Sequence, residues 1–279
     1  MSTEGAVLKR LSIVLICTLL MVLAIQFSFN AVPVFAEEQD ENLAKQSQNP
    51  IGDIISLPLV SRFDFDAGPE DAFAYTLEAK PVYPVNFGDI NMINRLIVPI
   101  RYQEAMVQGG DDEFGLGDTV YQAFFSPAKP GKAIWGAGPA FIIPTHTDDS
   151  LGNDKWSAGP AVVVLAKPGH WLYGMLAQHF WDFAGDDDAA DVNLSSIQIF
   201  INYNFPEFYL TTSPTFQYNH EAHSGDRWTV PLGGGAGKLV KFGKMPVDFK
   251  LTAYVNVEAP DSAPDWYTEF QVKFLFPKK

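Results

Sequence analysis

The sequence predicts an all-β protein, a transmembrane, antiparallel, up-and-down β-barrel of about 12 strands. Apolar and polar residues alternate with a period of two in segment after segment beyond residue 53. The connectors between these segments alternate between mostly long acidic loops and short turns, as expected for a chain that crosses a membrane and returns. All six tryptophans stand at segment ends, where aromatic girdles lie at the two membrane interfaces.

Residues 1–36 are typical of a secretory signal peptide. Lys9 and Arg10 form a basic start, and the apolar stretch Leu11–Phe27 follows them. A Val-Phe-Ala tripeptide ends at Ala36, so we expect cleavage after this residue. A retained transmembrane anchor is the alternative, because the apolar stretch is long for a signal.

Residues 37–52 are polar and show no strand pattern. They are predicted to be a flexible periplasmic leader with a helical turn near Leu43–Gln46. Residues 53–279 are predicted to form the outer-membrane barrel, with both of its ends on the periplasmic side because an even number of strands returns the chain to its starting side. Prolines inside several segments are expected at bulges or near the interfaces, since each removes a ladder donor.

The alternation sorts each segment into a lipid face and a lumen face. The residues predicted to face lipid include Phe63, Phe65, Leu77, Val98, Phe249, Leu251, Phe270 and Phe274. The charged residues predicted to line the lumen are Arg62, Asp64, Glu78, Lys80, Arg95, Arg101, Asp248, Lys250, Glu269 and Lys273. A strand of a soluble sandwich also alternates, but the length and number of these segments favour the barrel.

The connectors fall into two sets by their order along the chain. The acidic set is 66–71, 103–118, 145–156, 184–193, 219–227 and 258–265. The short set, mostly basic and built on Pro or Gly, is 86–90, 126–132, 167–170, 204–207 and 241–246. A soluble sandwich has no reason to sort its connectors in this way, so the sorting supports the membrane barrel.

Composition excludes several other classes of protein. The formal net charge of −14 disfavours nucleic-acid binding, because the phosphate backbone favours basic proteins. Cys17 is the only cysteine and lies in the predicted signal, which leaves the exported chain without disulfides, thiol nucleophiles or thiolate metal ligands. No long apolar run follows the signal, so helical membrane spans are not expected beyond it.

The lumen charges are the strongest functional signal in the sequence, and they have two interpretations. Both signs are interspersed along the predicted lumen face. In the first interpretation they form a salt-bridge network that plugs a narrow barrel. In the second they line a polar pathway whose charges select the solute.

Neither a metal site nor a catalytic site is predicted. The acidic clusters near Asp111, Asp148 and Asp186 lack the ligand spacing of a calcium loop, although they are suited to bridging cations toward lipopolysaccharide phosphates. An outer-membrane phospholipase would need a serine, a histidine and an acid on the barrel wall. The candidates are His146, His179, Ser195 and Ser196, and no spacing in the sequence brings a serine beside a histidine.

Eight short motifs together resemble one known family. They are LAKQSQNP at Leu43–Pro50, GLGD at Gly115–Asp118, SP at Ser126–Pro127, KPGK at Lys129–Lys132, KWSAGP at Lys155–Pro160, NYN at Asn202–Asn204, RWTVPLGGG at Arg227–Gly235 and DW at Asp265–Trp266. As a set they resemble the bacterial outer-membrane phenol-degradation (MetA-pathway) β-barrel family, some members of which are labelled neuromedin U. The resemblance implies a β-barrel and uptake of small, often hydrophobic, molecules. One departure is the end of the chain, where Phe276 is followed by Pro277-Lys278-Lys279 and not left as a terminal aromatic residue.

The sequence therefore predicts an outer-membrane channel or transporter for small, hydrophobic or aromatic, molecules, without catalytic activity or cofactor. A structural or adhesive surface barrel without transport is the alternative, and a barrel enzyme acting on lipid is the second alternative. The expected partners are outer-membrane lipid and lipopolysaccharide, the barrel-assembly machinery and a small-molecule solute.

Overall fold

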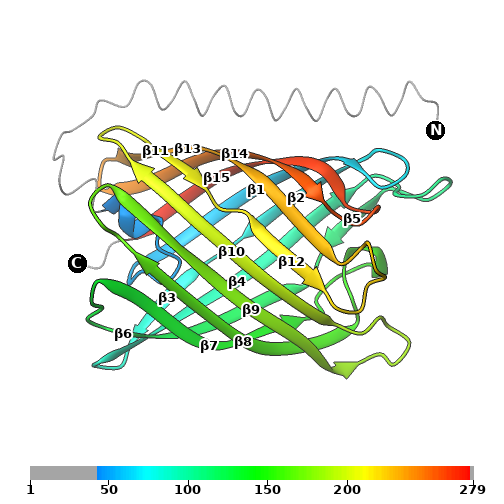
Figure 1. The fold of residues 1–279 in the computed structure, drawn as a ribbon, viewed down its shortest axis with the longest axis horizontal. Coiled ribbons are helices and arrows are strands. Elements are labelled where there is room, and N and C mark those ends of the chain that lie inside the picture. Colours follow the sequence, from blue (N-terminus) through cyan, green and yellow to red (C-terminus); the bar gives the residue numbers. More distant parts are fainter. Residues whose placement is uncertain (1–42, 277–279) are drawn as a thin grey trace.

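A computed structural model describes residues 43–276 of the chain, and its fifteen strands form one sheet that closes into a barrel (Figure 1). The strands are β1 (Ile55–Ala67), β2 (Ala72–Ala79), β3 (Val82–Asn86), β4 (Ile90–Gln103), β5 (Glu113–Leu116), β6 (Thr119–Pro127), β7 (Ala133–Ile143), β8 (Lys155–Ala166), β9 (Trp171–Gly185), β10 (Asn193–Asn204), β11 (Tyr209–Thr212), β12 (Thr215–Asn219), β13 (Trp228–Phe242), β14 (Met245–Glu258) and β15 (Pro264–Phe276). A 3₁₀ turn, η1, covers Asp149–Leu151. Among residues 43–276, no helix has both the length and the hydropathy to span a membrane.

Three membrane crossings are each made of two short strands, so the sheet is a 12-stranded antiparallel barrel, as the sequence predicts. β2 and β3 both lie between β1 and β4, β5 and β6 both pair with β4, and β11 and β12 both lie between β10 and β13. Proline explains two of the breaks, because Pro81 follows β2 and Pro214 precedes β12 and neither can donate to the ladder. At the second break the Ser213 amide donates to the Tyr254 hydroxyl at 3.0 Å.

The barrel closes between the two ends of the chain. β1 pairs with β15 along its whole length, with Ile55 opposite Phe276 and Phe65 opposite Trp266. Both described ends of the barrel therefore lie at the same rim. In the described part of the chain, the strands begin at Ile55 and end at Phe276.

The connectors sort by end as the sequence predicts. The loops 68–71, 104–112, 144–154, 186–192, 220–227 and 259–263 lie at one end, and the turns 87–89, 128–132, 167–170, 205–208 and 243–244 lie at the other. In bacterial outer-membrane barrels the longer loops are extracellular and the short turns periplasmic. We call the two ends the loop end and the turn end.

The outer surface has the pattern of a surface in contact with lipid. Apolar side chains such as Val162, Ile199 and Leu251 are 37–49% exposed on the outside of the barrel. All six tryptophans are 37–51% exposed and lie near strand ends. The exposed apolar belt and the aromatic residues at its two edges are those of a barrel in a bacterial outer membrane.

The eight residues predicted to face lipid alternate with lumen residues, as expected. Leu251, for example, lies between Lys250 and Thr252 and is itself 42% exposed. Phe63 is only 8% exposed, and its ring centroid lies 5.1 Å from that of Tyr75 on the neighbouring strand.

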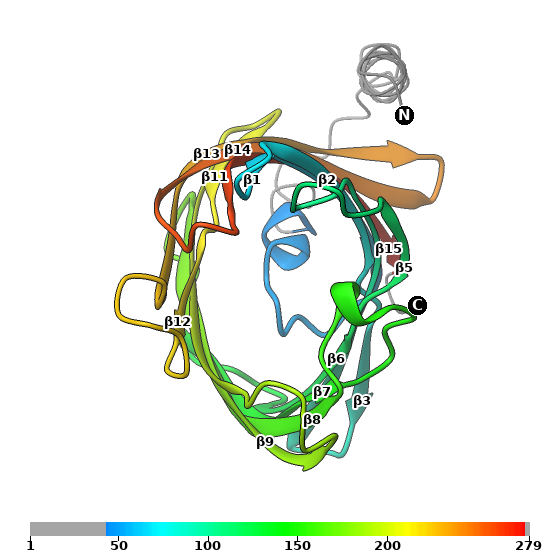
Figure 2. The ribbon, with the colours of Figure 1, turned by 90° about the vertical axis from the view of Figure 1, so that its right-hand side faces the viewer.

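The described part of the predicted leader is inside the barrel. Residues 43–47 form a short helix, as the sequence predicts, and the chain then runs through the lumen to β1. Figure 2, which looks into the loop end, shows this blue segment within the ring of strands. Ser47 is 1% exposed and Ile51 is 4% exposed. Residues 43–54, which we call the lumen segment, are therefore packed inside the barrel, whereas the sequence predicts a leader outside the barrel up to residue 52.

We expect that Leu251→Arg will lower the free energy of unfolding by about 2–4 kcal/mol, because it places a charge in hydrocarbon near the middle of β14. Val257→Arg, close to the loop end of the same strand, is the matched control and should cost about 0–1 kcal/mol. Urea titration of the folded barrel in lipid vesicles measures both. Equal losses from the two variants would show that residue 251 is not at the centre of the bilayer.

Candidate functional site

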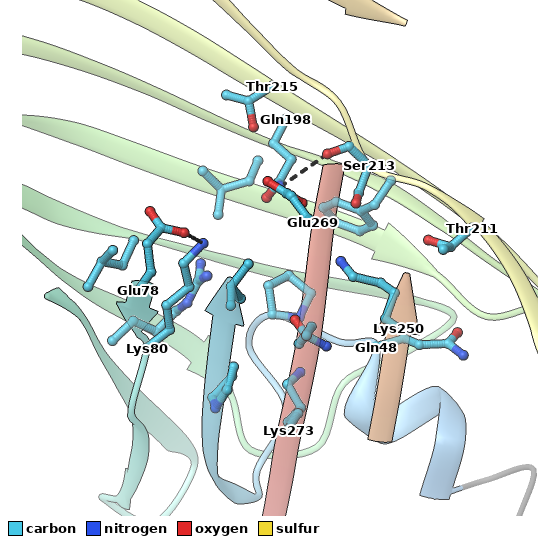
Figure 3. Close-up of a pocket in the computed structure, with 18 of the residues that line it drawn as sticks. Gln48, Glu78, Lys80, Gln198, Thr211, Ser213, Thr215, Lys250, Glu269 and Lys273 are labelled. Carbon is cyan, nitrogen blue, oxygen red and sulfur yellow. Dashed lines mark hydrogen bonds and ion pairs between the residues drawn. The ribbon is translucent and has the colours of Figure 1, made fainter. Parts of the chain in front are cut away.

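The lumen contains a cavity of about 420 Å³ between the barrel wall and the lumen segment. Side chains of β1–β4, β6 and β9–β15 line it, and residues of the lumen segment from Gln46 to Ile54 bound it toward the turn end. Figure 3 shows polar side chains around this space, including Glu78, Lys250 and Gln198, which come from three different parts of the ring of strands. The cavity is therefore the candidate site for a solute inside the barrel.

Eight of the ten charged residues predicted from the sequence line this cavity. They are Arg62, Glu78, Lys80, Arg95, Asp248, Lys250, Glu269 and Lys273. Asp64 is buried beside Arg62 on the same face of β1. Arg101 lies farther along β4, where its Nη1 donates to the Leu151 carbonyl of the long 144–154 loop at 3.2 Å. The structure thus brings nine of the residues into one cluster and places Arg101 at the mouth of the loop end.

Four of the lumen charges form two ion pairs, each between positions two residues apart in the chain. Arg62 Nε donates to Asp64 Oδ1 at 2.8 Å, and its guanidinium lies 3.7 Å from the centre of the Tyr267 ring. Lys80 forms an ion pair with Glu78. These pairs are typical of a wall in which charges are balanced locally, because a charge away from water is costly unless it is paired.

Asp248 is the most buried acid of the cluster, with 1% of its surface exposed. The Tyr209 hydroxyl contacts both of its carboxylate oxygens at 3.0 Å. Tyr209 reaches this position across β13 at Gly237, where any side chain would collide with the tyrosine ring. The glycine at position 237 of β13 therefore allows an aromatic side chain to pack inside the barrel.

One part of the interior wall is apolar, and the sequence analysis missed it. The buried side chains of β6–β10 include Phe124, Val163, Leu165, Leu172, Leu176, Phe180 and Phe200. They face the lumen, because they alternate with exposed residues such as Val162, Val164 and Tyr173. Both faces of these strands are apolar, so the rule of a polar lumen does not hold there. We call the charged part formed by β1, β2, β14 and β15 the polar wall and the β6–β10 part the apolar wall.

The lumen segment bridges the two walls at the turn end. Ile51 packs into the cluster of the apolar wall, and the Lys273 ammonium of the polar wall donates to the Ser47 carbonyl. The side-chain amides of Gln48 and Asn204 bond to each other at 2.7 and 3.3 Å. Lys45 Nζ donates to the Gly169 carbonyl in a short turn at 2.6 Å. The segment therefore narrows the lumen at this end, and no pattern in residues 43–54 predicts that role.

The 144–154 loop folds over the mouth of the loop end. Leu151 is fully buried, and His146 lies among three acids. His146 Nδ1 lies 2.7 Å from Asp118 Oδ1, and Nε2 lies 3.2 Å from Asp154 Oδ1. His146, Asp149 and Asp154 have ligand atoms within 4.8 Å of one another, a spacing that suits a metal ion. The sequence places Asp149 in an acidic cluster but does not indicate its meeting with His146.

The candidate histidine and serine for an enzyme do meet, but on the outside of the barrel. His179 and Ser195 lie opposite each other on β9 and β10, with 2.7 Å between Nδ1 and Oγ. Ser195 Oγ also lies 3.0 Å from His220 Nε2. The Trp181 ring lies 3.9 Å from the His179 ring, so this group belongs to the aromatic belt near the loop end. Ser196, in contrast, is buried toward the lumen.

Comparison with known proteins supports the fold. An outer membrane channel from Pseudomonas putida F1 aligns with a TM-score of 0.64 and 15% sequence identity, over 82% of this chain and 97% of that chain. Outer membrane phospholipase A from Escherichia coli aligns with a TM-score of 0.43 and 13% identity, over 84% and 96%. The translocator domain of the autotransporter NalP from Neisseria meningitidis aligns with a TM-score of 0.43 and 9% identity, over 86% and 94%.

No protein-family model matches the chain, and no curated protein matches its sequence. The β-barrel itself is present in the structure, and its similarity to the P. putida channel shows that the fold is that of bacterial outer-membrane barrels.

We expect the docking of the 144–154 loop to weaken as pH rises, because the hydrogen bond to Asp118, followed by the charges of Asp118, Asp154 and Asp149, raises the pKa of His146 above 6.5. A raised folded-state pKa means that the protonated histidine favours the docked loop. This contribution is complete below pH 6.5 and is lost as pH rises through the folded pKa. Hydrogen exchange at the Asn153 amide, which donates to Asp118, should accelerate over that range.

An NMR titration of the His146 ring checks the cause of the shift. Asp118→Asn should lower the pKa of His146 more than Asp149→Asn does, since Asp118 makes the direct hydrogen bond and Asp149 acts only through its charge. A pKa of His146 at or below 6.5 in the unaltered protein would contradict the pH-dependent docking of the 144–154 loop.

Proposed function

We propose that this barrel is an outer-membrane channel for small molecules, and that its solute includes hydrophobic or aromatic groups. The observation that carries the proposal is the cavity between a polar and an apolar wall in the lumen. A structural barrel would not need buried cations facing an internal space. The similarity to the P. putida channel agrees with this function but rests on the fold alone.

The membership in the phenol-degradation family remains part of this proposal. It rests on the eight motifs, several of which lie at structurally distinctive places. Gly117 and Asp118 of the GLGD motif separate β5 from β6, and the LAKQSQNP motif forms most of the lumen segment. Assembly by the barrel-assembly machinery and contact with lipopolysaccharide through the acidic loops follow from the same proposal, as does the absence of enzymatic activity.

The Ser195–His179 contact favours a lipid-directed hydrolase as the second candidate function. A serine nucleophile needs a base within hydrogen-bond reach, and this pair meets that condition. It also needs donors for the oxyanion, and the backbone amides of β9 and β10 around this pair are engaged in the ladder. Phospholipid hydrolysis by the purified protein that disappears in Ser195→Ala would establish this candidate in place of a purely interfacial role for the cluster.

Single-channel recording in planar bilayers tests the channel. We expect a small conductance with weak ion selectivity, because a barrel of about 12 strands is narrower than a porin and long side chains occupy its bore. Arg95→Gln combined with Arg101→Gln should shift the reversal potential in a salt gradient toward cations. A silent protein through which no solute passes into liposomes would overturn the channel and favour a structural barrel.

Deletion of residues 43–52 should increase the conductance severalfold, because the lumen segment then no longer narrows the turn end. Gln48→Ala should increase the conductance less than the deletion does, because it removes only the two hydrogen bonds between Gln48 and Asn204. Heat-modifiable migration on gels confirms that each variant is folded. An unchanged conductance after the deletion would show that the narrowest part of the path lies elsewhere.

A further inference from the structure

Arg95 differs from the other lumen cations in its surroundings. It lies on β4, opposite Val82 on one side and Gln122 on the other, and its side chain lines the cavity together with Ile97. Its Nη1 atom is buried and bonds to no group within residues 43–276. A buried guanidinium nitrogen without a partner is costly, so this position favours the binding of a ligand that brings an acceptor.

The remaining charges do not supply that acceptor. Asp64 and Glu78 are already bonded to Arg62 and Lys80. Asp248 accepts from the Tyr209 hydroxyl and lies opposite Lys273 in the ladder, and Glu269 lies on β15 two residues before Gln271, the partner of Lys250. The cluster therefore contains five cations and four carboxylates, all nine named above, and Arg95 is the cation with a buried nitrogen that has no hydrogen-bond partner within residues 43–276.

A second polar atom beside Arg95 is also unbonded. Gln122 donates its side-chain NH₂ group to Gln178, and its own Oε1 is buried without a donor. A lone donor and a lone acceptor thus stand at opposing positions of one ladder. Together they leave a polar spot in the cavity wall for a guest molecule or for water.

This polar spot lies where the two walls meet. β4 separates the β2–β3 crossing, of which β2 belongs to the polar wall, from β6, where the apolar wall begins. Leu176 and Phe200 of the apolar wall line the same cavity as Arg95. A ligand bound here would place a negatively charged group at the guanidinium and an apolar group against Leu176 and Phe200, where burial of apolar surface is favourable.

We propose that the lumen binds small organic monocarboxylates with an apolar body, and that Arg95 holds their carboxylate; the site rests on the proposed channel function. A planar guanidinium suits a carboxylate, because two parallel N–H···O bonds match the fork. A single uncompensated positive charge favours a monoanion, since the nearby carboxylates repel a second negative charge. A volume of about 420 Å³ is in the range of sites for one small ligand.

Equilibrium dialysis of the full-length protein in detergent against radiolabelled benzoate tests the site without requiring conduction. Four competitors separate the contributions to binding. Hexanoate keeps the carboxylate and an apolar body, acetate lacks the apolar body, chloride lacks the carboxylate geometry, and benzyl alcohol lacks the charge. We expect hexanoate to compete well, and acetate, chloride and benzyl alcohol to compete about tenfold more weakly or worse. Arg95→Gln should weaken benzoate binding by about tenfold, whereas Arg95→Lys should restore part of it.

Arg101→Gln is the matched control, because it removes an arginine of the same strand that is held at the loop end by the Leu151 carbonyl. Its benzoate binding should equal that of the unaltered protein. Absence of benzoate binding, or equal binding by Arg95→Gln, overturns the carboxylate site. Planar bilayers then report separately on the channel: conductance without Arg95-dependent binding leaves the channel intact, and Arg95-dependent binding without conductance removes the channel while the site remains.

Discussion

The pairing of β1 with β15 is the contact on which the rest of the structure depends. In hydrocarbon an unpaired backbone N–H or C=O costs several kcal/mol, so a sheet can cross a membrane only if it has no free edge. Twelve antiparallel membrane crossings form the ring here. The pairing of β1 with β15 closes it and joins residues as distant in the chain as Ile55 and Phe276. Once the ring is closed, every side chain must face either lipid or lumen, and all later features of the molecule follow from that division.

The interior is divided a second time, between a polar and an apolar wall. The polar wall balances its charges in local pairs such as Arg62 with Asp64, which lets a narrow barrel contain many ionised groups. The apolar wall has no charges to pair, and its side chains are stabilised by contact with other apolar groups. At the turn end, Ile51 of the lumen segment covers part of this wall. The segment is held by contacts with both walls, so it belongs to the architecture of the pathway as much as the strands do.

The cavity takes its character from the place where the walls meet. An acidic protein with acidic outer loops would repel anions at its mouth, yet the nine-residue cluster around the cavity contains one cation more than it has carboxylates. A solute that is mostly apolar and carries one negative charge is repelled weakly outside and attracted inside. This combination is consistent with a path for small amphipathic molecules and argues against a general porin.

The sequence by itself determined the number and direction of the strands, the two kinds of connector, the aromatic girdles and the charged lumen residues of β1, β2, β14 and β15. It did so because each of these properties is local: the period of two, the composition of a loop and the position of Trp266 beside an acidic loop are visible without any partner strand. The sequence could not predict which side of β8 and β9 faces the lumen. Apolar residues occur on both sides of these strands, so the alternation does not distinguish a lumen face from a lipid face. For the same reason the lumen-facing Leu176 was indistinguishable from the lipid-facing Met175.

Only the tertiary structure decided which charges are neutralised, which rings meet and what fills the turn end. Arg95 is as ordinary in the sequence as Arg62, and its isolation depends on the register of β4 against Val82 and Gln122. The meeting of His179 with Ser195 and the passage of residues 43–54 through the lumen likewise join segments that are distant in the chain. Such contacts are set by closure of the ring and by the shape of its interior, and neither is encoded in the pattern of any single segment.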